Sequence, residues 1–192
     1  MKPSPELLRI FEELLLSRAI PMGLISASDR GVLWDRHILD SLRAAEAFRE
    51  EDGRCFDLGS GAGLPGIPLA IALPDRDLML IESRRRGVAF LELAVDRLGL
   101  ANVQVLPDRI ESVVGEVAAG RLSPADVATA RALAPIARSW RLAAPLLRPG
   151  GRLVYFAGEG LSDPETAARR AGADGEILVL DSSAPLVIMG RR

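Results

Sequence analysis

The residues best suited to chemistry are a glycine-rich run and an acidic residue that follows it. The run, residues 57–66, has the sequence DLGSGAGLPG and comes directly after an apolar stretch. Glycines at this density let a strand turn sharply into a helix, and they let backbone N–H groups approach a ligand closely. Glu82 ends a second apolar run, and a carboxylate there can accept hydrogen bonds from both hydroxyls of a ribose. Together these features predict a nucleotide-cofactor pocket.

Glycine spacing alone does not identify the cofactor. Residues 61–66 also match the Gly-x-Gly-x-x-Gly fingerprint of dinucleotide-binding proteins, so an NAD site stays open as an alternative. Residues 1–53 precede this strand, however, whereas a dinucleotide-binding unit often begins near the start of its domain. Pro65 and Pro68 also leave the following helix with few N–H donors for a pyrophosphate. These features favour a cofactor without phosphates.

Length and composition predict a single domain. The 192 residues, of which 48% are hydrophobic, suffice for one substantial core, with residues 1–50 as a helical extension packed on a core at 54–192. One cysteine, Cys55, and one histidine, His37, predict neither an intrachain disulfide nor a zinc site. Without a signal-peptide core or an apolar run near the roughly 20 residues that span a bilayer, we expect a cytoplasmic protein without a membrane partner.

The charge balance limits how the chain can bind nucleic acid. Its net charge is −2 and its pI is near 5.6, so any contact with RNA must be local. Arg84, Arg85 and Arg86 follow the acidic residue Glu82 at an expected helix start, where the helix dipole disfavours cations. This run is either a solvated basic turn or a contact to RNA phosphate.

The order of predicted elements indicates an α/β fold. Amphipathic helices are expected near 4–19 and 33–48, followed by alternating strands and helices. The expected strands are 54–58, 77–82, 102–106, 125–130, 151–157, 176–181 and 185–190. The first five should be parallel, whereas the short link 182–184 predicts an antiparallel hairpin for the last two. A Rossmann-like, mostly parallel sheet closed by such a hairpin is typical of class I S-adenosylmethionine-dependent methyltransferases.

Most of the chain resembles the bacterial ribosomal RNA small subunit methyltransferase G family, also called glucose-inhibited division protein B. The matching segments are 34–42 (WDRHILDSL), 57–68, 80–83, 90–91, 98–103, 109–111, 129–132 and 145–151. The resemblance implies methyl transfer from S-adenosylmethionine to N7 of a guanine in 16S ribosomal RNA of the small ribosomal subunit. Guanine N7 carries an exposed lone pair, so positioning suffices and no general base is needed.

The resemblance also implies roles for individual residues. Arg131, at the end of the fourth strand, is expected to line the cofactor site. His37 and Asp40 lie three apart on one helix face, where they could border the substrate or form a structural hydrogen-bonded pair. Glu111 could contact adenine or only favour a helix start. The remaining implied cofactor contacts are the loop residues Gly59, Gly61, Gly63 and Leu64, the ribose ligand Glu82, and Ile110 beside the adenine.

The chain departs from the family pattern at two places that bear on RNA binding. Glu159 lies where the family often has a lysine nearby, and an acid there would repel phosphate. Arg86-Gly87 replaces a Lys-Arg pair and keeps one charge. The alternatives are therefore a methyltransferase acting on a small molecule, an NAD-dependent oxidoreductase, or a cofactor-binding module without activity. We expect a monomer.

Overall fold

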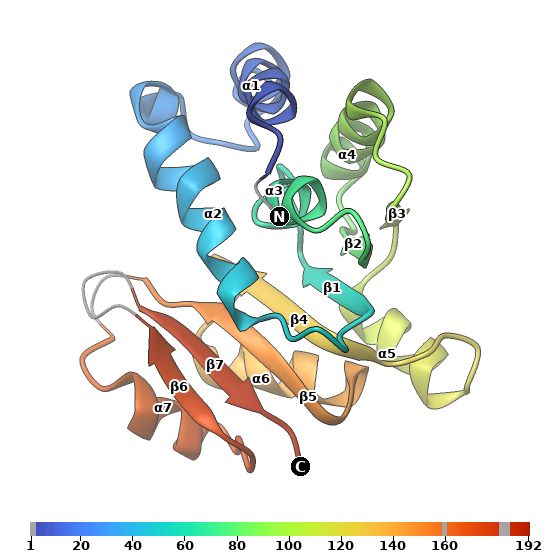
Figure 1. Ribbon diagram of the computed structural model, residues 1–192, viewed down its shortest axis with the longest axis vertical. Helices are drawn as coiled ribbons and strands as arrows, with labels where there is room; N and C mark the ends of the chain where they lie inside the picture. Colours follow the sequence, from blue (N-terminus) through green and yellow to red (C-terminus); the bar gives the residue numbers. More distant parts are fainter. Residues whose placement is uncertain (1–2, 159–160, 181–184) are drawn as a thin grey trace.

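The computed structural model describes residues 3–158, 161–180 and 185–192. These residues form one seven-stranded sheet in the order β3-β2-β1-β4-β5-β7-β6 (Figure 1). The strands are β1 (Arg54–Leu58), β2 (Asp77–Ile81), β3 (Val103–Leu106), β4 (Ala125–Arg131), β5 (Leu147–Phe156), β6 (Ile177–Leu180) and β7 (Leu186–Gly190).

The strand directions confirm the predicted fold class. Strands β1 to β5 are parallel to one another, and β7 runs antiparallel to both β5 and β6. The link predicted at 182–184 lies outside the described residues. Strand β5 begins at Leu147, earlier than the predicted residue 151, because Leu147 pairs with Ala125 before a shift in register.

Helical segments occupy both regions predicted near the N-terminus, although not as uniform α-helices. The first α-helix continues into a π-helical turn, and the second region changes from π-helix through α-helix to 3-10 helix. In chain order these segments are α1 (Pro5–Leu14), η1 (Leu15–Ala19), η2 (Ala27–Gly31), η3 (Leu33–Leu39), α2 (Asp40–Leu42) and η4 (Arg43–Ala47). The later helices are α3 (Gly66–Ala72), α4 (Arg85–Leu98), α5 (Ile110–Ala118), α6 (Ile136–Ala143), η5 (Ala144–Leu146) and α7 (Pro164–Arg170).

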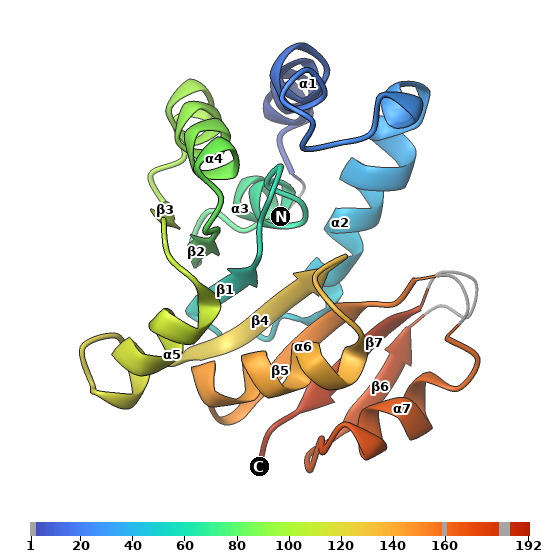
Figure 2. The same ribbon diagram turned by 180° about the vertical axis from the view of Figure 1, so that it is seen from behind.

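Helices cover both faces of the sheet. Helices α1 to α4 lie on one face, and α5, α6 and α7 lie on the other (Figures 1 and 2). Successive strand residues alternate between the two cores, so Cys55 packs toward the first group of helices and Phe56 toward the second. Because β1 lies between β2 and β4, the connections that leave β1 and β4 depart to opposite faces. Ligands of open α/β sheets bind at such a switch point, at the carboxyl ends of the strands.

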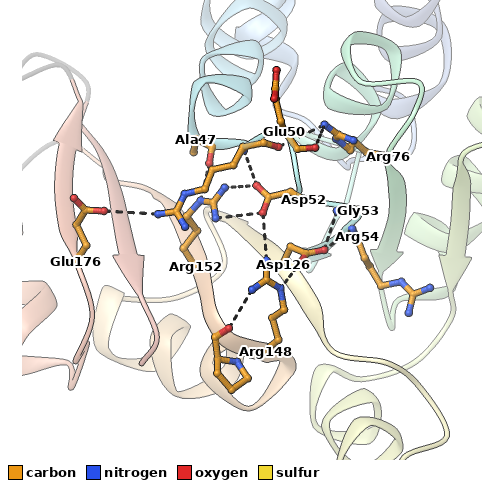
Figure 3. A network of polar contacts seen from close by, with 12 residues as sticks. Ala47, Glu50, Asp52, Gly53, Arg54, Arg76, Asp126, Arg148, Arg152 and Glu176 are labelled. Carbon is orange, nitrogen blue, oxygen red and sulfur yellow. Dashed lines mark hydrogen bonds and ion pairs between the residues drawn. The ribbon is translucent and has the colours of Figure 1, made fainter.

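The opposite end of the sheet carries a network of ion pairs (Figure 3). Arg152 of β5 and Asp52, which precedes β1, are both buried and pair with each other. Arg152 also donates from Nε to the carbonyl oxygen of Ala47, 2.6 Å away. These contacts attach the end of the N-terminal helical segment to the sheet. Within the described residues, no helix is both long enough and apolar enough to cross a membrane.

Candidate active site

A pocket of about 390 Å³ opens at the carboxyl ends of the central strands. Its size falls within the range of small-molecule sites in proteins. Its walls come from the ends of β1 and β2, the loops that follow β3 and β4, and helix α6. The lining residues are Gly59, Ile81, Glu82, Ser83, Arg84, Asp108, Arg109, Ile110, Glu111, Ala132, Leu133, Ala134, Arg138 and Leu142.

The glycine loop is tied to the end of β2. Gly59, Gly61 and Gly63 have φ values of +72°, +54° and +78°, a left-handed conformation that residues with a Cβ rarely adopt. The N–H groups of Gly59 and Ser60 both donate to the carbonyl oxygen of Ile81, at 2.9 and 3.0 Å. The loop predicted from sequence therefore forms one rigid unit with the strand that carries the acidic residue.

Glu82 joins this unit through its side chain. The side chain is 3% exposed, and Oε2 accepts a hydrogen bond from the N–H of Gly61 at 2.9 Å. Oε1 accepts from the backbone N–H of Arg84 at 2.7 Å and from its Nε at 3.1 Å, and Arg84 Nη2 lies 3.3 Å from Oε2. Burial acts to raise the pKa of Glu82, but the hydrogen bonds from Arg84 and Gly61 hold it below its ordinary value. Glu82 is therefore a carboxylate at neutral pH.

Gly87, in the first turn of α4, explains how Glu82 fits there. A Cβ on Gly87 would lie 2.6 Å from Cγ of Glu82, so any side chain would displace the carboxylate. In the sequence alone, Gly87 stands out only as a lost positive charge. The structure shows that this position provides the space in which the acidic side chain lies.

The structure brings some of the predicted cofactor residues to the pocket and not others. Ile110 is buried and Glu111 is exposed, and both line the pocket at the start of α5. Leu64, in contrast, is partly buried against the core beside α3. The pocket lining includes Gly59 but not Gly61 or Gly63, which shape the loop behind it.

Arg131 lies at the end of β4, but its guanidinium turns toward the N-terminal helices rather than the lining of this pocket. It donates to the carbonyl oxygens of Arg36 and His37 at 2.7 and 3.1 Å, and to Ser41 Oγ at 3.1 Å. Its Nη2 also lies 3.4 Å from Asp40 Oδ2. His37 and Asp40 thus both contact Arg131, which ties this helix to the end of β4.

The contacts of His37 fix its tautomer. Arginine only donates hydrogen bonds, so Nδ1 of His37, 3.2 Å from Arg131 Nη2, must accept. Nε2 then carries the proton and donates to Asp29 Oδ2 at 3.2 Å. Burial lowers the pKa of His37, and the charge of Arg131 lowers it further, whereas Asp29 acts in the opposite direction. The imidazole is therefore neutral at neutral pH.

Asp57, the first residue of the glycine-rich run, is buried at the base of the loop. Its Oδ1 accepts from Thr129 Oγ1 at 2.8 Å, whereas Oδ2 has no hydrogen-bond partner among the described residues. Burial raises the pKa of Asp57 to about 6. The loop is thus built over a carboxylate that is costly to keep charged.

Sequence reasoning missed several pocket residues. Asp108 and Arg109 follow β3, and Ala132 follows β4 with a φ of +50°, which is uncommon for a residue other than glycine. The sequence signal that could have identified these three residues is that each closely follows the end of a predicted strand. Arg138, in the first turn of α6, had no signal other than being a cation at a helix start. The described residues contain no group of His, Cys, Asp and Glu that could hold a metal ion.

Comparisons with known proteins show which family this chain resembles. The family model of rRNA small subunit methyltransferase G matches residues 4–175. A protein of that name from Acidiphilium cryptum is 44% identical over 163 residues, covering 84% of this chain and 71% of the relative. One from Mycobacterium leprae is 40% identical over 163 residues, covering 85% of this chain and 64% of the relative. This chain is thus similar to roughly two thirds of each relative's length.

Solved structures show the same fold. The O-methyltransferase TomG from Streptomyces achromogenes, solved in complex with S-adenosylmethionine, superposes with a TM-score of 0.65 at 18% identity. The match covers 100% of this chain and 92% of TomG. With the family match over most of the sequence, this chain belongs to the rRNA small subunit methyltransferase G family of S-adenosylmethionine-dependent methyltransferases.

Proposed function

We propose that this protein transfers the methyl group of S-adenosylmethionine to N7 of a guanine in the 16S ribosomal RNA of the small ribosomal subunit. The observation that carries the proposal is the hydrogen bond from the N–H of Gly61 to the buried carboxylate of Glu82, within a pocket of suitable size, in a chain of this family. This pairing holds the glycine loop and the acidic residue in one arrangement. A nucleoside can then bind between them.

The residues of the pocket fit the nucleoside part of the cofactor. Glu82 would accept the two ribose hydroxyls with the lone pairs that the backbone N–H groups leave, in competition with the exposed guanidinium of Arg84. Ile110 would contact the adenine ring through its apolar side chain, and Glu111 would lie at the polar edge of the ring. Gly59 contributes backbone without a side chain to the wall of the pocket. Arg131 would act indirectly, by holding the N-terminal helices beside the site.

The proposed reaction suits the side chains that are present. When bound, S-adenosylmethionine supplies a methyl group on a positively charged sulfur. Guanine N7 needs no deprotonation, so the protein has to orient the base and exclude misaligned approaches. The residues that line the described pocket include no histidine, and His37 is held by Arg131 and Asp29. The proposed reaction requires neither a pocket residue nor His37 to act as a general base.

Of the three arginines predicted to contact RNA at the start of α4, two have partners within the protein. Arg84 pairs with Glu82, and Arg86 Nη1 donates to the carbonyl oxygen of Met22 at 3.2 Å. Arg85 is exposed, and we retain it as an RNA contact. Glu159 lies outside the described residues. We further propose that the protein acts as a monomer in the cytoplasm, where small subunits are available.

The test is transfer of labelled methyl from S-adenosylmethionine to small ribosomal subunits from cells that lack this enzyme, followed by digestion and identification of the modified base. Label on N7 of a 16S guanine would support the proposal. Protein that binds the cofactor but leaves subunits unlabelled would contradict it and favour a small-molecule substrate. A rise in melting temperature with S-adenosylmethionine but not with NAD would separate the methyltransferase from the oxidoreductase alternative.

A further inference from the structure

Three helices start around the pocket, and each has an arginine at or near its start. Arg84 precedes the first residue of α4, Arg109 precedes that of α5, and Arg138 lies in the first turn of α6. All three side chains line the pocket. The amino end of a helix carries partial positive charge, so a cation at each of these positions opposes folding. Such an arrangement in a chain of net charge −2 indicates that an anion is bound nearby.

The fold pairs only one of these three side chains. Arg84 is held by the carboxylate of Glu82, whereas the guanidinium of Arg109 makes no hydrogen bond or ion pair with any described residue, and neither does that of Arg138. The position of Arg138 is nevertheless well defined. Ile136 and Trp140 bury the other side of α6 against the sheet, which holds Arg138 at the rim of the pocket.

The surroundings of Arg138 limit what the anion can be. The pocket also carries the carboxylates of Glu82, Asp108 and Glu111, so the site has no broad positive field. A single phosphate approached by a planar guanidinium fork fits this balance better than a surface that grips RNA throughout. We propose that Arg138 binds a backbone phosphate of the RNA strand that carries the target guanine. This inference rests on the proposed function.

The experiment compares Arg138→Gln, Arg138→Lys and a matched control, Arg141→Gln. Arg141 is exposed on the same helix about one turn later, and it does not line the pocket. Methyl transfer to small subunits is measured over a range of salt concentrations, together with the binding of S-adenosylmethionine and the melting temperature. These readouts separate binding of RNA, binding of cofactor and stability of the fold.

We expect Arg138→Gln to raise KM for subunits about 3- to 10-fold, and to reduce the slope of log affinity against log salt by about 0.7. Arg138→Lys should recover part of that slope, because it keeps the charge but not the fork. Cofactor affinity should stay within about twofold of wild type. The melting temperature of Arg138→Gln should rise by about 1–3 °C, since an unfavourable charge leaves the helix start. Arg141→Gln should change neither KM nor the salt slope.

Three results would overturn the inference. An unchanged KM and salt slope would show that no phosphate is bound by Arg138. Weaker binding of S-adenosylmethionine would place the guanidinium on the cofactor instead, and a fall in melting temperature would indicate a structural role. Wild-type protein that neither binds nor methylates subunits would contradict the proposed function itself, and this result is distinct from an effect confined to the Arg138 variants.

Discussion

Both ends of the parallel strands carry arginines and carboxylates, and the two sets are arranged differently. At the amino end, Asp52 and Arg152 are buried and bonded to each other (Figure 3). Asp52 also accepts from the backbone N–H of Arg49 at 2.7 Å, and Asp126 accepts from those of Gly53 and Arg54 at 2.9 and 2.8 Å. The carboxylates there have partners in the fold, although Nε of Arg54 is buried without a hydrogen-bond partner among the described residues.

At the carboxyl end, the same residue types are left partly unpaired. Asp57 is buried with one oxygen that lacks a partner among the described residues, and Arg138 is exposed without one. Other charged groups at this end do have partners, since Gly61 and Arg84 contact Glu82, and Arg131 contacts the N-terminal helices. The difference indicates that the amino end is built mainly for stability. The carboxyl end leaves Arg138 available to a ligand in the pocket, and it buries the carboxyl group of Asp57 at some cost to stability.

The largest effect should come from breaking the amino-end network. Asp52→Asn leaves Arg152 buried without a charged partner, which should lower the free energy of unfolding by about 3–5 kcal/mol. Urea unfolding measures the loss. The matched control is Asp77→Asn, because Asp77 is 69% exposed, lies 3.7 Å from Arg54, and should contribute less than about 1 kcal/mol. Equal losses in the two variants would show that the buried network has no special role.

Asp57 should stabilise the folded protein more at low pH than at neutral pH. Its pKa is about 6 in the folded protein and 3.8 in the reference state, so folding favours the protonated form. The contribution of Asp57 to stability is therefore lowest above pH 6 and grows as the pH falls toward 3.8.

The comparison that isolates this effect is wild type against Asp57→Asn. The difference in free energy of unfolding should shift by about 2 kcal/mol in favour of wild type between pH 7 and pH 4. Denaturant unfolding at each pH measures it, and other titrating groups cancel because both proteins contain them. A difference that stays constant over this range would mean that Asp57 is not held in an unfavourable charged state.

Glu82→Gln tests the acidic residue of the pocket. Losing the charge that would accept two ribose hydroxyls should weaken binding of S-adenosylmethionine about 10- to 100-fold, while the similar shape keeps the fit against Gly87. Titration calorimetry measures the affinity. Glu92→Gln, an exposed change on helix α4, is the control and should leave the affinity unaltered. Unchanged affinity in Glu82→Gln would remove Glu82 from the proposed cofactor contacts.

The sequence predicted the sheet well because the relevant signals are local. Alternating or continuous apolar runs marked the strands, and the short link 182–184 was enough to predict the antiparallel pair. The glycine loop and Glu82 were also predicted, since both lie next to strand ends in the chain. The N-terminal helices were predicted by their apolar periodicity, but nothing in that periodicity distinguishes the π-helical turns at η1 and η3 from α-helix.

Contacts between distant segments were the part that sequence could not supply. Arg131 pairs with the carbonyl oxygens of Arg36 and His37, far back in the chain, so its position after β4 did not reveal which way it turns. Gly87 was another such case, because its close approach to Glu82 depends on how α4 leaves the strand. Arg138 lacked any motif, and only the assembled pocket shows it beside the site.

The smallest effect should come from substituting Arg84, an exposed side chain that is paired with the buried carboxylate of Glu82. Its guanidinium contacts the same carboxylate oxygens of Glu82 that the proposed function assigns to ribose hydroxyls, yet its side chain is 70% exposed. An ion pair with so exposed a partner contributes at most about 1 kcal/mol, so Arg84→Gln should tighten binding of S-adenosylmethionine by no more than about fivefold.

Salt distinguishes this competition from a positioning role. Screening weakens an exposed ion pair, so wild-type affinity for S-adenosylmethionine should increase modestly between 0.02 and 0.5 M salt, about as much as the substitution itself achieves. Arg84→Gln should show no such increase, and Arg85→Gln, one residue further along, should behave as wild type. If Arg84→Gln instead binds the cofactor more weakly, the guanidinium orients Glu82 for the ribose. In that case this part of the carboxyl end is a fixed, paired arrangement like the network around Asp52.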